Sequence, residues 1–196
     1  MKAMGINFGT GTAVPEYQDL SFKLNFPLSG NQSISFFGLL GSSKVDFIKD
    51  PEDENLYVED NTNTYSRTRT GVIGANYFKS FNKKTLLNIS ASAGTLMDGD
   101  YLDTLNTNGD AASYYGMDFR NSTYSLNAHI SHKINAKNVF KTGIFNNVIN
   151  LNMIDTVFNY SLDKYVKVTD IEGTTYLARP YIEYQYRPSL RWKINA

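Results

Sequence analysis

Cysteine is absent from the 196-residue chain, which excludes a disulfide, a thiolate nucleophile and a cysteine metal site. Lysine and arginine number 19, as do aspartate and glutamate, so the net charge gives no sign of electrostatic capture of nucleic acid. Proline and tryptophan are scarce, with five residues and one. The chain also has no run of 18 apolar residues of the kind that forms a transmembrane helix.

Aromatic residues and period-two alternation are plentiful instead. Tyrosine and phenylalanine contribute 14 and 12 residues, and both favour β-strands. Leu20, Phe22 and Leu24 alternate with polar neighbours, and successive side chains of a strand point to opposite faces. The same alternation recurs over residues 87–93, 124–131, 176–186 and 190–195. Each predicted strand therefore has one apolar face and one mostly polar face.

The connections between the predicted strands alternate in length. Short polar turns occur at 29–32, 82–84, 135–138 and 187–189, and long polar stretches at about 49–64, 98–117 and 155–173. In an up-and-down meander this alternation places all short turns on one rim, as in outer-membrane barrels with short periplasmic turns. We therefore predict an all-β fold, an antiparallel up-and-down meander of an outer-membrane β-barrel. About eight strands are expected in a single segment covering residues 1–196.

The alternation also predicts which side chains face lipid and which face the lumen. A charge that faces lipid is costly, so charged strand residues are expected on the lumen side. The predicted lumen-facing residues are Lys23, Asn127, His129, Arg179, Glu183, Arg191 and Lys193, and the same argument includes Arg67 and Arg69. The predicted lipid-facing residues are Leu20, Phe22, Leu24, Leu126, Ala128, Ile130, Ile182 and Trp192.

Aromatic residues gather near the short turns, as in the interfacial girdles of membrane barrels. The predicted girdle consists of Phe26, Tyr77, Phe78, Phe81, Phe140, Tyr184, Tyr186 and Trp192. Two segments alternate poorly: 36–40 has apolar residues on both faces, and 145–151 changes phase. A bulge, or contact with another part of the protein, would account for either segment.

No catalytic chemistry is recognisable in the sequence. His129 and His132 are three residues apart, so a strand places them on opposite faces and they cannot jointly bind a metal. The acidic residues of 50–54, with Glu59 and Asp60, have no EF-hand spacing and are interpreted as a solvated loop. With no nucleophile motif or phosphate loop, we expect neither an enzyme nor a cofactor or metal site.

Several segments resemble a known family. Leu20–Leu28 followed by Ile34–Phe47 is similar to a barrel segment of TonB-dependent outer-membrane receptors of the Bacteroidota type, which carry a carboxypeptidase-regulatory-like extension. Residues 135–143 and 177–181 resemble later hairpins of the same region, and the likeness begins at about Gly9. The resemblance implies a 22-stranded barrel with an N-terminal plug, localisation in the bacterial outer membrane and nutrient uptake.

The same resemblance implies the partners. They are outer-membrane lipid, the remainder of the barrel with its plug domain, the TonB complex and a surface lipoprotein, with no nucleic acid. Because no signal peptide or plug domain is recognisable, a mid-barrel fragment is expected. Two alternatives stay open: a small complete outer-membrane barrel with a structural or adhesive role, and a soluble β-sandwich binding module. A sandwich usually has turn signals every 8–12 residues.

Overall fold

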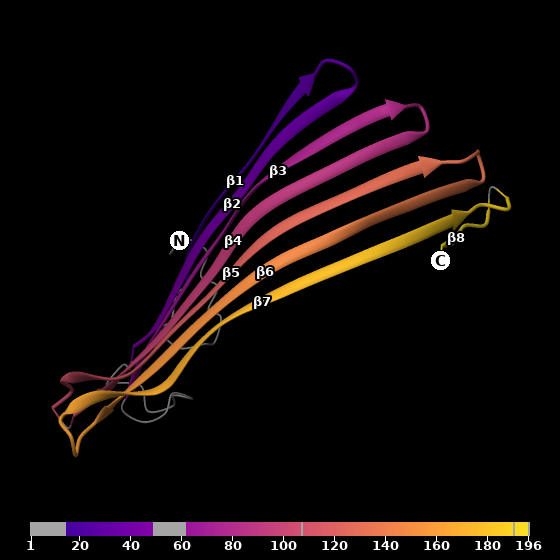
Figure 1. Ribbon diagram of the computed structural model, residues 1–196. Helices are drawn as coiled ribbons and strands as arrows, with labels where there is room; N and C mark the ends of the chain where they lie inside the picture. Colours follow the sequence, from indigo (N-terminus) through magenta and orange to yellow (C-terminus); the bar gives the residue numbers. More distant parts are fainter. Residues whose placement is uncertain (1–14, 49–61, 107, 190, 196) are drawn as a thin grey trace.

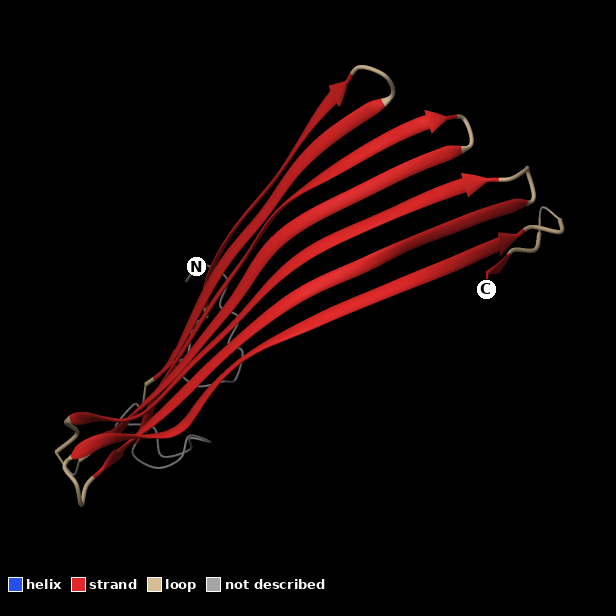
Figure 2. Cartoon of the chain, viewed as in Figure 1, coloured by secondary structure: helices blue, strands red, loops and turns tan. Residues whose placement is uncertain are grey.

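The computed structural model describes residues 15–48, 62–106, 108–189 and 191–195. They form one antiparallel sheet whose strands follow one another in sequence order (Figure 1). The strands are β1 (Glu16–Leu28), β2 (Gln32–Phe47), β3 (Thr62–Asn82), β4 (Thr85–Leu105), β5 (Ala111–Lys133), β6 (Asn138–Asn159), β7 (Lys164–Tyr186) and β8 (Ile194–Asn195). The predicted all-β meander is confirmed, and the described residues contain no helix (Figure 2).

The described sheet is open and its strands are long. β1 pairs with β2 at one edge and β8 pairs with β7 at the other. Strands β3 to β7 have 21 to 23 residues each, against about five or six in most soluble sheets. At about 3.4 Å per residue they extend for roughly 70–80 Å, more than twice the ~30 Å hydrocarbon core of a bilayer. Nowhere in the described ranges is there a helix long and apolar enough to cross a membrane.

Three of the four predicted short turns are confirmed, and asparagine side chains stabilise two of them. The fourth, predicted at 187–189, belongs to a longer connection between Tyr186 and Ile194. The side-chain Oδ1 of Asn82 accepts hydrogen bonds from the backbone amides of Lys84 and Thr85 at 2.8 and 3.0 Å. Asn135 accepts in the same way from two backbone amides of its turn, at 2.9 and 3.0 Å. Such side-chain-to-backbone bonds replace the strand pairing that stops at the turn. In the β1–β2 turn, Gly30 and Asn31 have φ of +73° and +58°, a region that glycine and asparagine tolerate best.

Two of the three predicted long loops are largely strand. The stretch 98–117 contains the end of β4 and the start of β5, joined through 106–110. The stretch 155–173 likewise contains the end of β6 and the start of β7, joined through 160–163. The prediction was wrong because polar side chains do not interrupt backbone pairing, which continues through both stretches. The third stretch, with the acidic residues of 50–60, falls outside the described residues except for its last three positions, which begin β3.

The sheet has no hydrophobic core, because the described residues include no buried apolar side chain. The accessible surface of the chain is 14,609 Å². A folded soluble monomer of 22.1 kDa exposes about 9,300 Å². The backbone ladder therefore holds the sheet together, and its apolar face requires a cover from outside the described residues.

The two segments with poor alternation contain no bulge. β2 pairs in continuous register throughout, and β6 pairs without a shift on both sides over 145–151. Aromatic rings from these segments and their neighbours cover glycines on adjacent strands instead. A Cβ atom added to Gly74 would lie 2.5 Å from the Phe37 ring, and one added to Gly143 would lie 2.9 Å from the Tyr181 ring. Apolar residues therefore occur on both faces of the sheet because some aromatic rings cover glycines of the neighbouring strand.

Gly143 gives a direct test of this close packing. An added Cβ would lie 2.5 Å from the backbone oxygen of Ala128 and 2.7 Å from the Cβ of His129. Gly143→Ala should therefore lower the free energy of unfolding by about 1–3 kcal/mol, the usual cost of overpacking. Gly173 is the matched control, since a Cβ there meets nothing within 4 Å. The measurement is the urea midpoint of the protein in detergent micelles, and equal midpoints for the two alanine variants would refute the packing.

Candidate functional site

The strand register gathers apolar side chains on one face of the sheet. Directly paired residues share a face, so each row of partners can be followed from β1 to β7. One row consists of Leu24, Phe36, Ala75, Ala91, Leu126, Asn146 and Ala178. The next row towards the short turns consists of Phe26, Ile34, Tyr77, Ile89, Ala128, Ile144 and Pro180. These two rows and the rows on either side of them, which run through Tyr124 and Ile130 on β5, form a continuous surface, called here the apolar belt.

The register brings together all the predicted lipid-facing residues that lie on strands. Leu20, Phe22, Leu24, Leu126, Ala128, Ile130 and Ile182 share the face of the apolar belt. Trp192 is exposed and lies between β7 and β8, outside the ladder, so pairing assigns it to neither face.

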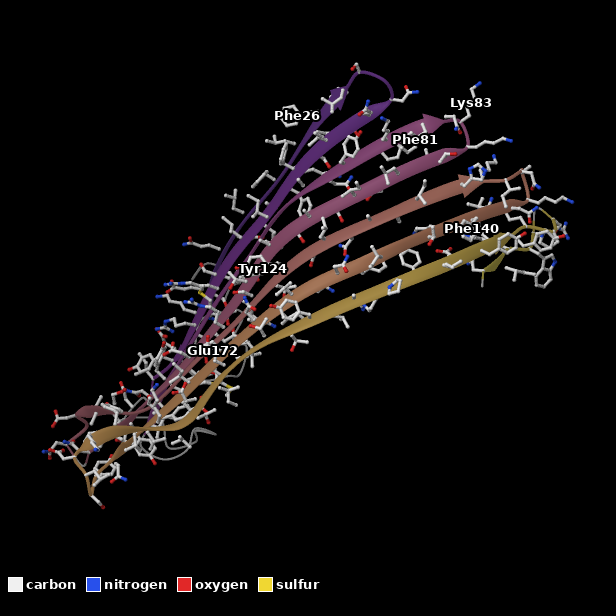
Figure 3. All side chains as sticks on the ribbon, in the orientation of Figure 1. Phe26, Phe81, Lys83, Tyr124, Phe140 and Glu172 are labelled. Atoms are coloured by element: carbon white, nitrogen blue, oxygen red, sulfur yellow. The ribbon has the colours of Figure 1, made fainter. Side chains whose placement is uncertain are left out.

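Aromatic side chains border the apolar belt on two sides. Phe26, Phe81 and Phe140 lie near the short turns, and Tyr124 lies farther along the strands (Figure 3). Phe140 pairs with His132, which is about 27 Å along β5 from Tyr124. With a strand tilt of about 40°, this length spans about 20 Å, close to the ~25 Å apolar band of membrane barrels.

One member of the predicted girdle lies elsewhere. Phe78 pairs with Ser33 and therefore lies on the opposite face. The sequence placed it wrongly because Tyr77 and Phe78 are consecutive aromatics, and only one of two neighbours on a strand can share a face with Phe26.

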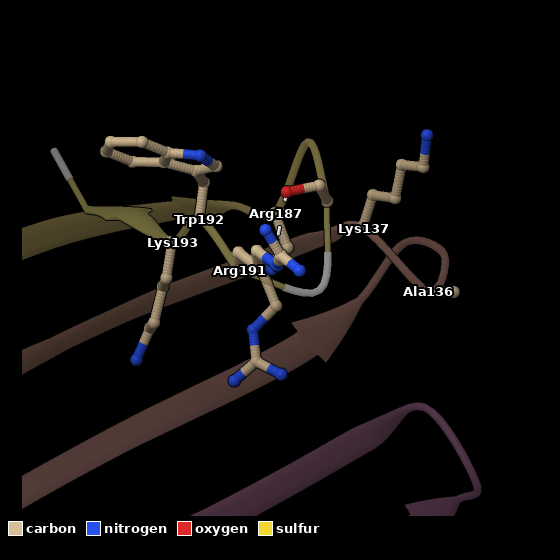
Figure 4. A pocket seen from close by; sticks show the side chains of 7 residues that line it. Ala136, Lys137, Arg187, Arg191, Trp192 and Lys193 are labelled. Atoms are coloured by element: carbon tan, nitrogen blue, oxygen red, sulfur yellow. Dashed lines mark hydrogen bonds between the residues drawn. The ribbon is translucent and has the colours of Figure 1, made fainter.

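The opposite face of the sheet is mostly polar and carries the predicted lumen-facing residues of the long strands. Those residues are Lys23, Asn127, His129, Arg179 and Glu183. Arg191 and Lys193 lie outside the ladder, beside the short-turn rim. There they line a pocket of about 410 Å³ together with Lys137, Arg187 and Trp192 (Figure 4).

Four side chains on the polar face of β6 and β7 form a cation–aromatic cluster. The rings of Phe145 and Tyr181 stack with centroids 5.1 Å apart. The Arg179 guanidinium lies 5.9 Å from the Phe145 centroid, and the Lys141 ammonium lies 5.6 Å from that of Tyr181. With its amide turned to suit its neighbours, Asn147 accepts a hydrogen bond from Arg179 at 3.2 Å. The cluster offers two fixed positive charges beside an aromatic surface.

Sequence reasoning identified Arg179 but missed the other three members of this cluster. Lys141 lies on β6 and Tyr181 on β7, and only the register between these two strands shows that the residues are neighbours. That register cannot be counted from the turn at 160–163, because the pairing shifts between Asp155 and Thr156.

Arg67 and Arg69 lie on the face of the apolar belt, and the prediction that they point to the lumen is wrong. Arg67 pairs with Lys44 of β2, and Arg69 pairs with Met97 of β4. The segment 67–70 is polar at every position, so its sequence carries no information about phase. Arg67 forms an ion pair with Asp46, and both residues lie beyond the belt, towards the far ends of the strands.

Some of the described histidines and tyrosines on the strands form hydrogen bonds with the neighbouring strand. His129 and His132 lie on opposite faces, as predicted, with His132 Nδ1 2.9 Å from the Thr85 hydroxyl. Beyond the belt, the Tyr101 hydroxyl donates to Asp118 at 2.7 Å, and this hydrogen bond, helped by burial, raises the pKa of the tyrosine. Within the described ranges, no group of three or more histidine and acidic side chains is arranged to hold a metal ion.

No protein-family model matches the chain, and no curated protein matches its sequence. The case for a function therefore depends on the geometry of the two faces and on the sequence resemblance.

Tyr181 tests the cation–aromatic cluster. Its hydroxyl is buried and has no hydrogen-bond partner among the described residues, so Tyr181→Phe should leave the free energy of unfolding unchanged or raise it slightly. Tyr181→Ala removes both the stack on Phe145 and the cover over Gly143, and should cost about 2–4 kcal/mol. Urea midpoints of the two variants provide the comparison. A phenylalanine variant as unstable as the alanine variant would show that the hydroxyl has a partner and that stacking is not the main interaction.

Proposed function

We propose that this chain forms part of the wall of an outer-membrane β-barrel, in a TonB-dependent receptor that imports a nutrient. The observation that carries the proposal is the apolar belt, which continues across seven strands while the opposite face of the same strands stays mostly polar. No catalytic step is proposed. The barrel wall separates lipid from a polar path, and the strand ends beyond the belt contact ligands outside the cell.

The size of the apolar belt favours lipid as its cover. Seven strands about 4.8 Å apart, over the roughly 20 Å from Tyr124 to Ile130, make a face of roughly 600–700 Å². The largest apolar patch of a typical soluble monomer is about 300–600 Å². A sheet also meets the main demand of hydrocarbon, because its backbone groups pair with the neighbouring strand rather than with water. Only the two edges lack partners within the described residues, and more strands would pair with them.

The position of the belt along the strands supports one orientation. On β5 the belt ends at Ile130, about 10 Å from the strand end at Lys133. On the other side, β5 continues for about 44 Å from Tyr124 to Ala111. Outer-membrane barrels have short periplasmic turns and large extracellular parts. The short-turn rim is therefore assigned to the periplasm and the extended strand ends to the outside.

Two observations favour a large receptor barrel over a closed eight-stranded one. β1 pairs only with β2 and β8 only with β7, so the described sheet presents two separate edges that further strands would join. The polar face carries the cation–aromatic cluster and other charged groups, which need water or a plug domain beside them. The interior of an eight-stranded barrel is filled by its own side chains. The resemblance of 20–47 to TonB-dependent receptors agrees with the larger barrel.

Cysteine labelling on whole cells tests both membrane placement and orientation. The chain has no natural cysteine, so single introduced cysteines can be read without background from it. In the protein as its own cells produce it, Asn106→Cys should react with a membrane-impermeant maleimide. Lys83→Cys, in the β3–β4 turn, should react only after the outer membrane is permeabilised.

Each other labelling pattern has a distinct meaning. Labelling of Lys83→Cys alone on intact cells would reverse the orientation. Equal labelling of both positions before permeabilisation would contradict a membrane wall, and labelling of neither position would place the chain inside the cell.

A further inference from the structure

Two arginines beyond the apolar belt stand apart from the other charged groups on its face. Arg69 of β3 and Arg120 of β5 both pair with Met97 of β4, so the three residues form one row, called here the arginine row. Two strand spacings separate the arginine Cα atoms by about 10 Å. Each guanidinium can reach about 6 Å or more from its Cα, so both can contact one small anion above Met97.

These two arginines are exposed and have no ion pair or hydrogen bond with another described residue. The other cations nearby on the same face are paired: Lys44 with Glu16 at 3.1 Å, and Arg67 with Asp46. Arg69 and Arg120 are therefore two cations without an ion-pair partner among the described residues.

Two acidic groups lie near the row, and neither forms an ion pair with one of its arginines. Asp118 lies two residues beyond Arg120 and accepts a hydrogen bond from Tyr101 at 2.7 Å. Glu172 belongs to the same row but is two strands away from Arg120, about 10 Å between Cα atoms, with no contact between the side chains. It lies nearer the far strand ends than Tyr124 does (Figure 3).

The space between the arginine row and the belt is lined by small and hydroxyl side chains. The row of partners there includes Gly71, Thr95 and Ser122, and the two hydroxyls lie 3.2 Å apart. The next row contains Ile73 and Tyr124, at the edge of the belt. From belt to strand end, the surface thus changes from apolar to hydroxyl to cationic within about 14 Å along the strand.

We propose that Arg69 and Arg120 bind the phosphate headgroup of an anionic lipid in the outer leaflet, whose acyl chains lie against the apolar belt. The proposal rests on the proposed function, since the belt must face lipid. Guanidinium groups bind phosphate through charge-assisted, often bidentate, hydrogen bonds. The hydroxyls of Thr95 and Ser122 offer further hydrogen bonds to the sugar or glycerol part of the headgroup. A soluble anion would use only the row, whereas a lipid uses the row and the belt together.

The test is a native mass spectrometry titration of the intact protein, extracted from its own cells in detergent micelles. The probe is a glycolipid with two phosphate monoesters, diphosphoryl lipid A, and the comparison lipid is its dephosphorylated form. The wild-type protein should bind the phosphorylated probe more tightly. Arg69→Gln/Arg120→Gln should weaken that binding by about 25-fold, or about five-fold for each charge near the membrane surface. Lys83→Gln/Lys84→Gln removes two charges from the exposed short-turn rim and should leave it unchanged.

Three outcomes would overturn the proposal. The double arginine variant could bind the probe as well as wild type does, or the dephosphorylated lipid could bind equally well. Inorganic phosphate at millimolar concentration could also displace the probe completely, which would assign the row to a soluble anion. Failure of the proposed function is a different observation: the wild-type protein would then stay monodisperse without detergent and would bind neither lipid.

Discussion

Continuous backbone pairing from β1 to β7 is the constraint on which the rest of the structure depends. In hydrocarbon an unpaired N–H or C=O costs several kcal/mol, so a membrane strand needs a neighbour along its whole length in the bilayer. The described strands keep their register through the apolar belt, and the shifts occur outside it, at Ser80/Asn82, Leu102/Asp103 and Asp155/Thr156. Pairing therefore fixes which side chains share a face, because a slip of one residue would move a whole strand's apolar set to the other side.

The side chains on the two faces of the sheet have different surroundings. On the apolar face the side chains contact only their neighbours in the sheet among the described residues, and the proposed function assigns their cover to lipid. On the polar face, aromatic rings lie over glycines, and cations lie over those rings, as Lys141 lies over Tyr181. The glycines leave room for the rings, so the polar face stays closely packed without a second layer of protein among the described residues.

The sequence predicted the long strands where one face was clearly apolar, but over 191–195 the predicted strand is reduced to Ile194–Asn195. Residues 124–131 alternate without a break, and the structure extends that alternation into β5 with the same residues sharing a face. Three short turns were equally predictable, and in two of them an asparagine side chain accepts local backbone amides. Outside the belt both faces are polar. The sequence there does not indicate which residues share a face, or whether a segment pairs as a strand. For this reason the strand ends in 98–117 were interpreted as loop, and Arg67 and Arg69 were assigned to the wrong face.

The candidate site was predictable in part. Asn127, His129 and Arg179 were placed together on the polar face from alternation alone, and the register groups them there. The stack of Phe145 on Tyr181 was not predictable, because it depends on the register of two strands joined past a shift in pairing. The arginine row depends in the same way on three strands paired in register, which no local pattern in the sequence reports.

The central claim is that one face of β5 meets lipid and the other meets water or protein. Spin-label accessibility along residues 124–131, in the protein reconstituted into lipid vesicles, tests it most directly. The account predicts a period of two: labels at Leu126, Ala128 and Ile130 are reached by oxygen dissolved in lipid and not by a polar nickel chelate. Labels at Asn127 and His129 are shielded from lipid-dissolved oxygen. If residue 128 is closed to both reagents, it lies in a protein core, and the membrane-wall account is wrong.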